Sequence, residues 1–329
     1  LTCLVEATRT VARYLKRGDY VVYESTVYPG CTEEVCVPLL EKGSGLKLGA
    51  DFKVGYSPER INPNDSEHTF SNTAKIVSAN DGQALDEVAR VYAEVVAADL
   101  CRASGIRVAE AAKMTENVQR SVNIALMNEL QRLFSRMGID MGEVIDMASS
   151  KWNFVKYRPG LGGGHCIPVD PLYLVSAASK LGVEMPVTSS GCAVNDGMAA
   201  YVVRSLLGAM GSDGRGARAL LMGVTYKENI DDIRNSRIAE MVGLLEREGM
   251  SVDVTDPHAD PDKVYAMYGI RPVPALRPPY DLIVVAVAHD EYRGLDDAYF
   301  RSISRGAALL GDIRGLYKGR IKSLGYWSL

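Results

Sequence analysis

The chain has 329 residues, 47% of them hydrophobic and 24% charged, a composition typical of a folded globular protein with room for two or three domains. Its 37 Lys and Arg against 41 Asp and Glu give a net charge of −4, which argues against a general nucleic-acid binder. The six cysteines and four histidines show no metal-ligand spacing, so we expect free thiols, no metal site and a reducing, cytoplasmic location. No apolar run is long enough to cross a bilayer, so we expect no membrane partner.

The first predicted element is an amphipathic helix that ends at Gly18, and Leu1 already lies within it. Because domains seldom begin inside an element, we expect the chain to begin partway through a domain. Strands and helices then alternate, which favours a parallel α/β sheet. The predicted strands are 20–24, 52–56 and 75–78, and the predicted helices end near Lys42 and run over 81–97.

A helical pattern without internal Gly or Pro covers Ile106 to Met137. At about 1.5 Å per residue this helix would be roughly 50 Å long, too long for one small domain, so we expect it to connect two. After it we predict helices over 140–149, 171–181 and 187–210, a linker at 211–216, strands at 219–224, 251–255 and 281–288, a helix over 238–248, and a last strand beginning near Leu309. The predicted fold class is α/β with domains at 1–104, 105–210 and 211–329.

The segment from Gly160 to Asp170 is the sharpest candidate site. Its glycines let the backbone approach a ligand closely and supply main-chain amide donors. Cys166 follows them directly and is placed to act as a nucleophile, while the Asp170 carboxylate could move protons or hold a water. The alternative is a loop with an inert, buried cysteine. A direct pair of Cys166 with His165 is disfavoured, because neighbours in an extended segment point in opposite directions.

The long helix carries four polar residues on one face, at positions 3, 4 and 3 apart: Glu110, Lys113, Asn117 and Arg120. Such a stripe is usually the solvated side of a helix. Lys113 and Asn117, one turn apart, are also two donors that could stabilise a developing oxyanion.

Polar loops follow several predicted strands, where ligands bind in parallel sheets, although each could be a plain turn. Ser25-Thr26 and 57–60 follow the first two strands, and Lys227 and Arg234 follow the first strand of the last domain, where cations suit a phosphate or form a surface ion-pair loop. Asp256 ends the next strand, where ribose-binding acids often lie. The chain has no G-x-G-x-x-G followed by a helix, so the usual pyrophosphate site is absent from it.

Together these motifs resemble those of the nucleotide-sugar 6-dehydrogenases, the UDP-glucose/GDP-mannose dehydrogenase family, over essentially the entire chain. The sequences of 23–34, 56–63 and 150–154 most resemble those of the branch that acts on UDP-N-acetylhexosamines, as in Vi-type capsular polysaccharide biosynthesis. The resemblance implies an N-terminal NAD-binding Rossmann domain, a long helix that builds a homodimer, and a C-terminal Rossmann-like domain for the UDP part. Family members also carry a further N-terminal segment with the glycine fingerprint, which this chain lacks.

The resemblance also implies a reaction, in which NAD takes two hydrides in succession and the C6 alcohol of a UDP-sugar becomes a carboxylate. Cys166 would hold the intermediate aldehyde as a thiohemiacetal and then a thioester. The catalytic residues carried over by position are Cys166, Lys113, Asn117, Asp170, Thr26 and Glu59. The implied substrate contacts are Arg60, Ile61, Asn62, Tyr157, Arg158, Gly162, Gly163, Tyr226, Lys227 and Arg314, and the implied cofactor contacts are Ser25, Thr26, Val27 and Arg234.

Two alternatives remain open. A UDP-glucose 6-dehydrogenase would differ in the room that the sugar loops leave for an N-acetyl group. A non-catalytic nucleotide-sugar-binding or dimerisation remnant is favoured by the missing fingerprint, and the presence of Cys166, Lys113, Asn117 and Asp170 argues against it.

Overall fold

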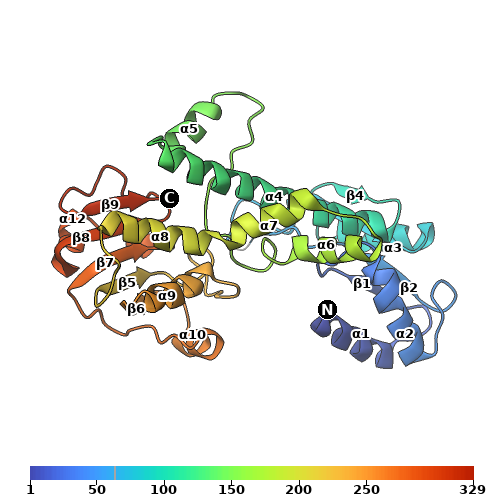
Figure 1. Ribbon diagram of the computed structural model, residues 1–329. Coiled ribbons are helices and arrows are strands. Elements are labelled where there is room, and N and C mark those ends of the chain that lie inside the picture. The colour runs from blue at the N-terminus through green and yellow to red at the C-terminus, as the bar shows by residue number, and fades with distance from the viewer. Residues whose placement is uncertain (63) are drawn as a thin grey trace. The chain divides into compact units, whose positions relative to one another are not determined.

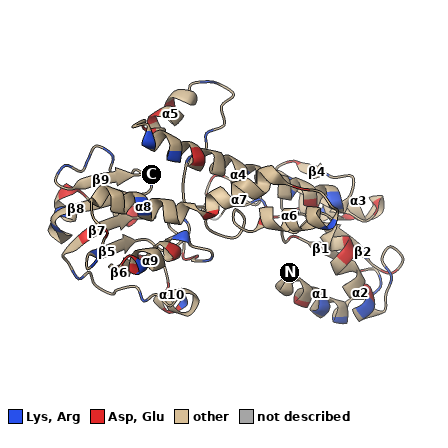
Figure 2. Ribbon diagram, viewed as in Figure 1, with Lys and Arg blue, Asp and Glu red and all other residues tan. Residues whose placement is uncertain are grey.

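The computed structural model describes residues 1–62 and 64–329, which form two compact units (Figure 1). The first unit comprises 1–119 and 170–185, and the second comprises 120–169 and 186–329. Each contains a sheet with helices packed on it, so the predicted α/β class is confirmed. Figure 2 shows acidic and basic residues interspersed along the helices of each unit. Within the described ranges, every helix is too short or too polar to cross a membrane.

The sheet of the first unit has four strands in the order β1-β2-β3-β4. β1 pairs with β2, and β3 with β4, in parallel, whereas β2 and β3 are antiparallel, so the prediction of a fully parallel sheet is wrong at this pair. The described residues between β2 and β3 contain no helix, and without a crossover helix the chain enters β3 from the same end of the sheet. The strands are β1 (Tyr20–Tyr23), β2 (Lys53–Tyr56), β3 (Lys75–Ala79) and β4 (Leu100–Arg102).

Helices cover both faces of this sheet, because side chains alternate along each strand. Tyr23 packs into one core with Ala12 and Leu40, while its neighbour Val22 packs with Val88 on the other face. The helices are α1 (Thr2–Tyr14), the π-helical η1 (Thr32–Cys36), α2 (Val37–Ser44), α3 (Gly82–Ala93) and α6 (Asp170–Lys180).

Three helices differ from prediction, and one of them is α3, which was predicted over 81–97 and ends at Ala93. α1 stops at Tyr14, because Leu15 is extended, and Gly18 instead adopts φ +89° in the turn before β1. The helix predicted over 187–210 is broken at Gly197 into α7 (Pro186–Asp196) and α8 (Met198–Met210). The long helix is confirmed as α4 (Ile106–Arg136), and α5 (Met141–Ala148) follows it, with the Asp140 side chain accepting from the N–H of Glu143.

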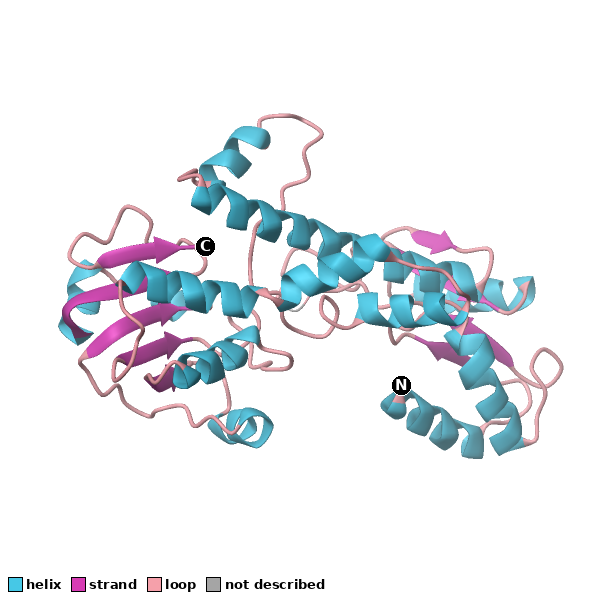
Figure 3. Cartoon of the chain, viewed as in Figure 1, coloured by secondary structure: helices cyan, strands magenta, loops and turns pink. Residues whose placement is uncertain are grey.

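The second unit has a five-stranded, all-parallel sheet in the order β6-β5-β7-β8-β9 (Figure 3). Leu221 of β5 faces α8 and α9, and its neighbour Leu220 faces Phe300 on the opposite side. Leu309, predicted to begin the last strand, lies inside β8. The elements are β5 (Arg218–Met222), α9 (Arg237–Arg247), β6 (Ser251–Thr255), α10 (Pro261–Tyr268), β7 (Tyr280–Val285), α11 (Asp290–Arg293), α12 (Asp297–Ile303), β8 (Ser304–Asp312) and β9 (Gly325–Ser328).

Candidate active site

The polar stripe on α4 is mostly buried. Glu110, Lys113 and Asn117 are 0%, 8% and 2% exposed, whereas Arg120 is exposed. A solvated helix face therefore does not describe the first three residues. A buried amino group and a buried carboxamide need polar partners, and these identify what each residue does.

Glu110 holds the backbone of the first unit. Its Oε2 accepts from the N–H of Gly30 at 2.6 Å and its Oε1 from the N–H of Thr32 at 2.9 Å. Burial raises the pKa of Glu110, and these hydrogen bonds work against the rise. Both acceptor atoms are thus occupied by the turn that starts η1, so Glu110 is an anchor for that turn.

Lys113, Asn117 and Asp170 come together in the first unit. Asn117 Nδ2 donates to Asp170 Oδ2 at 2.6 Å, and Asp170 is the first residue of α6. Burial raises the pKa of Asp170, while the Asn117 hydrogen bond and the positive charge of Lys113 lower it. A carboxylate with a raised pKa is a better proton acceptor, and a buried ammonium stabilises nearby negative charge.

The loops after β1 and β2 lie side by side at the carboxyl ends of these two parallel strands. The N–H of Ser57 donates to the carbonyl of Tyr23 at 2.9 Å. Ser25 is exposed and Thr26 half-buried, but Val27 is only 2% exposed and packs in the core. Val27 can therefore contact a ligand only through its main chain.

The same sheet edge has the chemistry that part of a nicotinamide dinucleotide needs. The hydroxyls of Ser25 and Thr26 and the adjoining main chain are neutral donors and acceptors, which fit a ribose or a carboxamide. They carry no cation for the phosphates. The residues thus fit the nicotinamide half of the cofactor.

The loop from Glu59 to Asn62 is held to the body of the first unit. Glu59 Oε1 accepts from the N–H groups of Arg60 and Ile61, both at 2.7 Å. An Arg60 amino group lies 2.8 Å from Glu116 Oε1 on α4. Arg60 thus fixes the loop, whereas Glu59 and Asn62 are exposed at its surface.

The glycine segment of the second unit, residues 160–164, is anchored at both ends by asparagines. The N–H of Gly160 donates to Asn128 Oδ1 at 2.9 Å, and Asn235 Nδ2 donates to the carbonyl of Gly164 at 3.0 Å. Gly164 adopts φ +83°, a backbone conformation that favours glycine. Beyond it, Cys166 is half-buried.

Tyr226 fills the space above these glycines. A Cβ atom added to Gly163 would lie 2.9 Å from Tyr226 Cβ, and one added to Gly164 would lie 2.8 Å from Tyr226 Cε2. The close approach predicted for a ligand is made here by Tyr226 of the protein itself, through its Cβ at Gly163 and its ring at Gly164. Burial raises the pKa of Tyr226, and the charges of Asp232 and Cys166 raise it further.

Three of the predicted substrate residues line one cavity of about 40 Å³ at the carboxyl ends of β5, β7 and β8: Tyr226, Lys227 and Arg314. Arg314 also lines a cavity of about 720 Å³, together with Arg158 and Lys318. Arginine and lysine side chains at the carboxyl ends of parallel strands suit a phosphate. The smaller cavity is a notch rather than a space for a whole nucleotide.

Other predicted contacts already have protein partners. Arg234 Nε donates to Asp232 Oδ1 at 2.9 Å, so Arg234 must leave this pair to reach a phosphate. Arg158 lies 3.3 Å from Asp146. Tyr157 packs against the apolar cluster of Met127, Met141 and Ile145.

The residues that hold the site in place carry no signal in the sequence. Asn128, Asn235 and His289 belong to no recognisable motif, and only their partners far along the chain reveal them. Asp256 was considered as a ribose ligand, but its side chain is fully buried and accepts from the N–H groups of Val224 and Thr225.

Comparison with known proteins matches the described arrangement. Three domains of the UDP-glucose/GDP-mannose dehydrogenase family match the chain: the NAD binding domain over 1–96, the central domain over 107–197 and the UDP binding domain over 220–319. A UDP-N-acetyl-D-glucosamine 6-dehydrogenase from Pseudomonas aeruginosa is 47% identical, over 96% of this chain and 76% of that protein. The enzyme of the same name from Salmonella typhi is 45% identical, over 95% of this chain and 75% of that protein.

A solved structure supports the same relationship. The UDP-D-ManNAc dehydrogenase from Pyrococcus horikoshii superposes with a TM-score of 0.89 at 28% identity, covering 100% of this chain and 76% of that one. With sequence identity near one half over nearly the whole chain, the conclusion does not rest on fold alone. The chain belongs to the UDP-glucose/GDP-mannose dehydrogenase family, whose members pair an NAD-binding domain with a UDP-binding one.

Proposed function

We propose that the chain is an NAD-dependent nucleotide-sugar 6-dehydrogenase that oxidises the C6 alcohol of a UDP-N-acetylhexosamine, UDP-GlcNAc or UDP-GalNAc, to the uronic acid for surface polysaccharide biosynthesis. The observation that carries the proposal is the buried group of Lys113, Asn117 and Asp170, which provides two donors for an oxyanion and one proton acceptor. The choice of an N-acetylated sugar is supported by the relatives at 47% and 45% identity.

Cys166 is the nucleophile in this proposal. Its thiolate attacks the aldehyde carbon left by the first oxidation and forms a thiohemiacetal, which keeps the reactive aldehyde from escaping. Bound NAD supplies the hydride acceptor for both oxidations. The second oxidation leaves a thioester on Cys166, and water then hydrolyses it to the carboxylic acid and the free thiol.

The polar residues of the first unit manage charge and protons. Lys113 and Asn117 stabilise the oxyanions that form on the sugar oxygen. Asp170, whose pKa is raised by burial, holds or activates water together with Thr26, and Glu59 assists thioester hydrolysis.

The remaining residues bind the UDP-sugar and the NAD cofactor. Lysine and arginine side chains at the strand ends neutralise the diphosphate, and hydroxyls and main chain at the first sheet edge meet the cofactor. The proposed substrate residues are Arg60, Ile61, Asn62, Tyr157, Arg158, Gly162, Gly163, Tyr226, Lys227 and Arg314, and the proposed cofactor residues are Ser25, Thr26, Val27 and Arg234.

A side-by-side turnover assay tests the proposal. NADH and uronic acid are measured with UDP-GlcNAc, UDP-GalNAc, UDP-ManNAc and UDP-glucose, and we expect two NADH for each acid, with an N-acetylgalactosamine or N-acetylglucosamine substrate fastest. Faster turnover of UDP-glucose would favour the alternative substrate. UDP binding by calorimetry, without NAD binding or NADH formation, would overturn the enzymatic proposal in favour of a binding remnant.

The proposal includes a homodimer formed through α4. Its support is an exposed apolar face on that helix, where Leu126 and Leu133 are 48% and 52% exposed and seven residues apart. Sedimentation analysis of the wild type and of Leu126→Glu tests it, since the charge should dissociate the dimer. A wild type that sediments as a monomer would contradict it.

The proposal also includes a cytoplasmic location and three domains. In the described residues the six cysteines stand as thiols and not as disulfides, which supports a reducing, cytoplasmic compartment. We place the domain boundaries after residues 104 and 210, on either side of the α4 to α8 region. Limited proteolysis should cleave near residues 104 and 210. Cleavage only at sites far from both positions would contradict these boundaries.

A further inference from the structure

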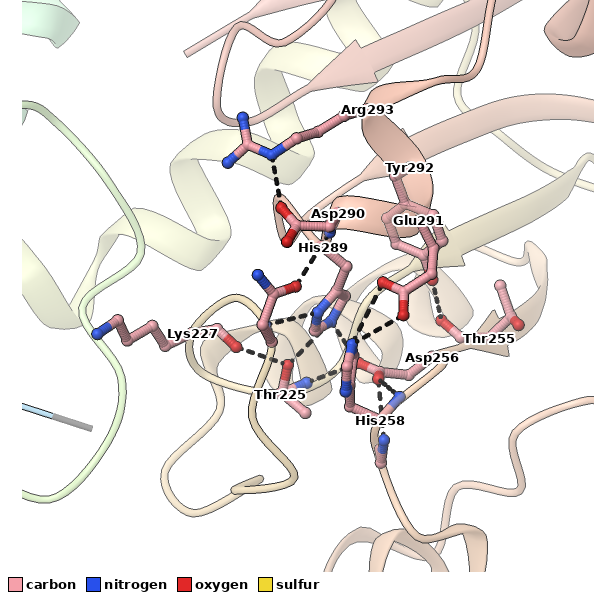
Figure 4. Close-up of polar contacts among 12 residues, drawn as sticks. Thr225, Lys227, Thr255, Asp256, His258, His289, Asp290, Glu291, Tyr292 and Arg293 are labelled. Carbon is pink, nitrogen blue, oxygen red and sulfur yellow. Dashed lines mark hydrogen bonds and ion pairs between the residues drawn. The ribbon is translucent and has the colours of Figure 1, made fainter. Parts of the chain in front are cut away.

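Asp256 and His289 form a buried polar pair at the carboxyl ends of β6 and β7 in the second unit (Figure 4). Both side chains are 0% exposed, and His289 Nε2 lies 3.2 Å from Asp256 Oδ2. Neither residue belongs to the substrate or catalytic set above. Two buried titratable groups that carry no assigned role need a physical explanation.

The hydrogen bonds of His289 assign its tautomer. The N–H of Asn229 donates to His289 Nδ1 at 3.0 Å, so Nδ1 is an acceptor and the ring proton lies on Nε2. Nε2 faces Asp256 Oδ2 at 3.2 Å and Thr225 Oγ1 at 3.1 Å. The neutral ring thus bridges Asp256 to two points of the turn that follows β5.

Asp256 binds the main chain of that same turn. Its Oδ2 accepts from the N–H groups of Val224 at 2.6 Å and Thr225 at 3.1 Å. Its Oδ1 accepts from the N–H groups of His258 at 2.8 Å and Ala259 at 2.9 Å. Burial alone would raise the pKa of Asp256, but the hydrogen bonds from His289 and the main chain outweigh it and hold the pKa below its usual value.

This arrangement occupies two main-chain N–H groups of the turn that could otherwise bind a ligand. In parallel α/β domains the main-chain N–H groups after the first strand commonly hold a phosphate. Here the Asp256 carboxylate occupies the N–H groups of Val224 and Thr225. These two N–H groups are therefore not available to a diphosphate, and we expect side chains of the turn to contribute to its binding, in positions that depend on how the turn is held.

The turn over 223–229 carries Tyr226 and Lys227, both proposed to contact UDP. Thr225 Oγ1 donates to the carbonyl of Lys227 at 3.0 Å, which passes the constraint from His289 along the turn. Tyr226 lies against Gly163 through its Cβ and against Gly164 through its ring. The buried pair thus supports the turn and, through Tyr226, the glycine segment that precedes Cys166.

A metal centre is the competing explanation of this cluster. His258, His289 and Glu291 offer ligand atoms within 4.8 Å of one another. Nδ1 of His289 already accepts from Asn229, and Nε2 donates to Asp256, so neither nitrogen has a lone pair to give without breaking the network. Hydrogen bonding to the turn accounts for the buried groups directly.

We infer that Asp256 and His289 are positioning residues that set the conformation of the 223–229 turn for binding a nucleoside diphosphate. The inference rests on the proposed function, because it takes Tyr226 and Lys227 as UDP contacts. Loss of the pair should weaken UDP binding far more than NAD binding. Three of the four proposed cofactor residues, Ser25, Thr26 and Val27, belong to the first unit, and only Arg234 lies near the turn.

The test measures UDP binding by calorimetry and amide hydrogen exchange of the peptide covering 223–229, both on the full chain. For His289→Ala we expect about tenfold weaker UDP binding and about tenfold faster exchange, as for the loss of buried hydrogen bonds. His289→Gln, whose amide nitrogen reaches the Nε2 position and can donate to Asp256, should restore most of the affinity. His258→Ala is the matched control, because its ring lies 4.7 Å from the His289 ring but, among the described residues, the hydrogen bond of its side chain goes to Glu291 and not to the turn, so we expect UDP binding close to wild type.

The outcomes distinguish failure of the positioning role from failure of the proposed function. UDP binding within twofold of wild type in His289→Ala overturns the positioning role. If that variant does not fold, Thr225→Val removes the hydroxyl between His289 and the Lys227 carbonyl, and unchanged UDP binding there also overturns it. If the wild type binds no UDP, the proposed function fails, and exchange alone then decides: faster exchange in His289→Ala supports the positioning role and unchanged exchange refutes it.

Discussion

Asn117 Nδ2 donates a hydrogen bond of 2.6 Å to Asp170 Oδ2, although 53 residues separate the two in the chain. Both side chains are buried, Asn117 on α4 and Asp170 at the start of α6. The bond stabilises the ionised carboxylate against the cost of burying it, and Lys113 contributes a favourable charge. Burial still prevails, so the carboxyl keeps its proton to a higher pH than it would in water.

Asp170→Asn tests this balance through stability. Because the pKa of Asp170 is raised in the folded chain, wild-type stability is lost as the pH rises through that pKa, whereas asparagine cannot ionise. The unfolding free energy of the variant relative to wild type should therefore increase from acidic to neutral pH, measured by urea unfolding at several pH values. A difference that is constant across pH contradicts the raised pKa.

Asp140→Asn is the control of opposite sign. The Lys318 ammonium lowers the pKa of Asp140, so the stabilising contribution is present at neutral pH and is lost as the pH falls. The variant should lose stability relative to wild type at neutral pH and approach it in acid.

Lys113→Ala should slow both oxidations by about a hundredfold or more, because a buried ammonium no longer opposes the oxyanion charge. The rate of NADH formation at saturating substrate measures the effect. Arg120→Ala, on the same helix but exposed, should retain wild-type turnover. If Lys113→Ala also retains it, Lys113 has no part in the chemistry.

Cys166→Ser should abolish uronic acid formation while the fold survives, because a serine hydroxyl is a far weaker nucleophile than a thiolate. Product analysis by chromatography and a thermal melt are the two measurements. Cys101→Ser, at an exposed cysteine of β4, should behave as wild type in both. An unaffected yield of acid from Cys166→Ser would remove the thiol from the mechanism.

Gly164→Ala should lower both stability and UDP affinity. The new methyl group would lie 2.8 Å from Tyr226 Cε2, and the backbone is held at φ +83°. Gly182→Ala separates the two effects, since Gly182 has φ +71° but nothing within 4 Å of an added Cβ. We expect about 1 to 3 kcal/mol of destabilisation from backbone strain in both variants, with a further loss and weaker UDP binding only in Gly164→Ala. Equal stability and equal UDP affinity of the two variants would mean that the Tyr226 side chain moves away from the new methyl group at no cost.

Sequence patterns predicted the elements that rest on local periodicity. The α/β alternation, the extent of α4 and the strands 20–24 and 251–255 were all predicted. In each of them, apolar residues recur along the sequence with the period of a helix or a strand. The glycine segment and Cys166 stood out for a different reason, because several glycines followed directly by a cysteine form one short contiguous motif. Short late elements such as α10 and β9 were missed, since a few residues carry too little periodic signal.

Whether a polar residue faces solvent or the interior was beyond the sequence. Glu110, Lys113 and Asn117 formed one polar stripe that any solvated helix could carry, and only burial separated an anchor of the backbone from a candidate catalytic pair. Asp256 stands after a strand, where ribose-binding acids often lie, but its carboxylate binds the protein's own amides.

By itself the sequence determined the family, the order of α/β and helical regions, and the reactive side chains, because these lie in short contiguous motifs. Tertiary structure alone decided which polar groups are buried together: Glu110 meets Gly30 across 80 residues, and His289 meets Thr225 across 64. The physical reason is that a pKa or a fixed turn depends on neighbours in space, and a one-dimensional pattern does not record which distant segments come to share one dry environment.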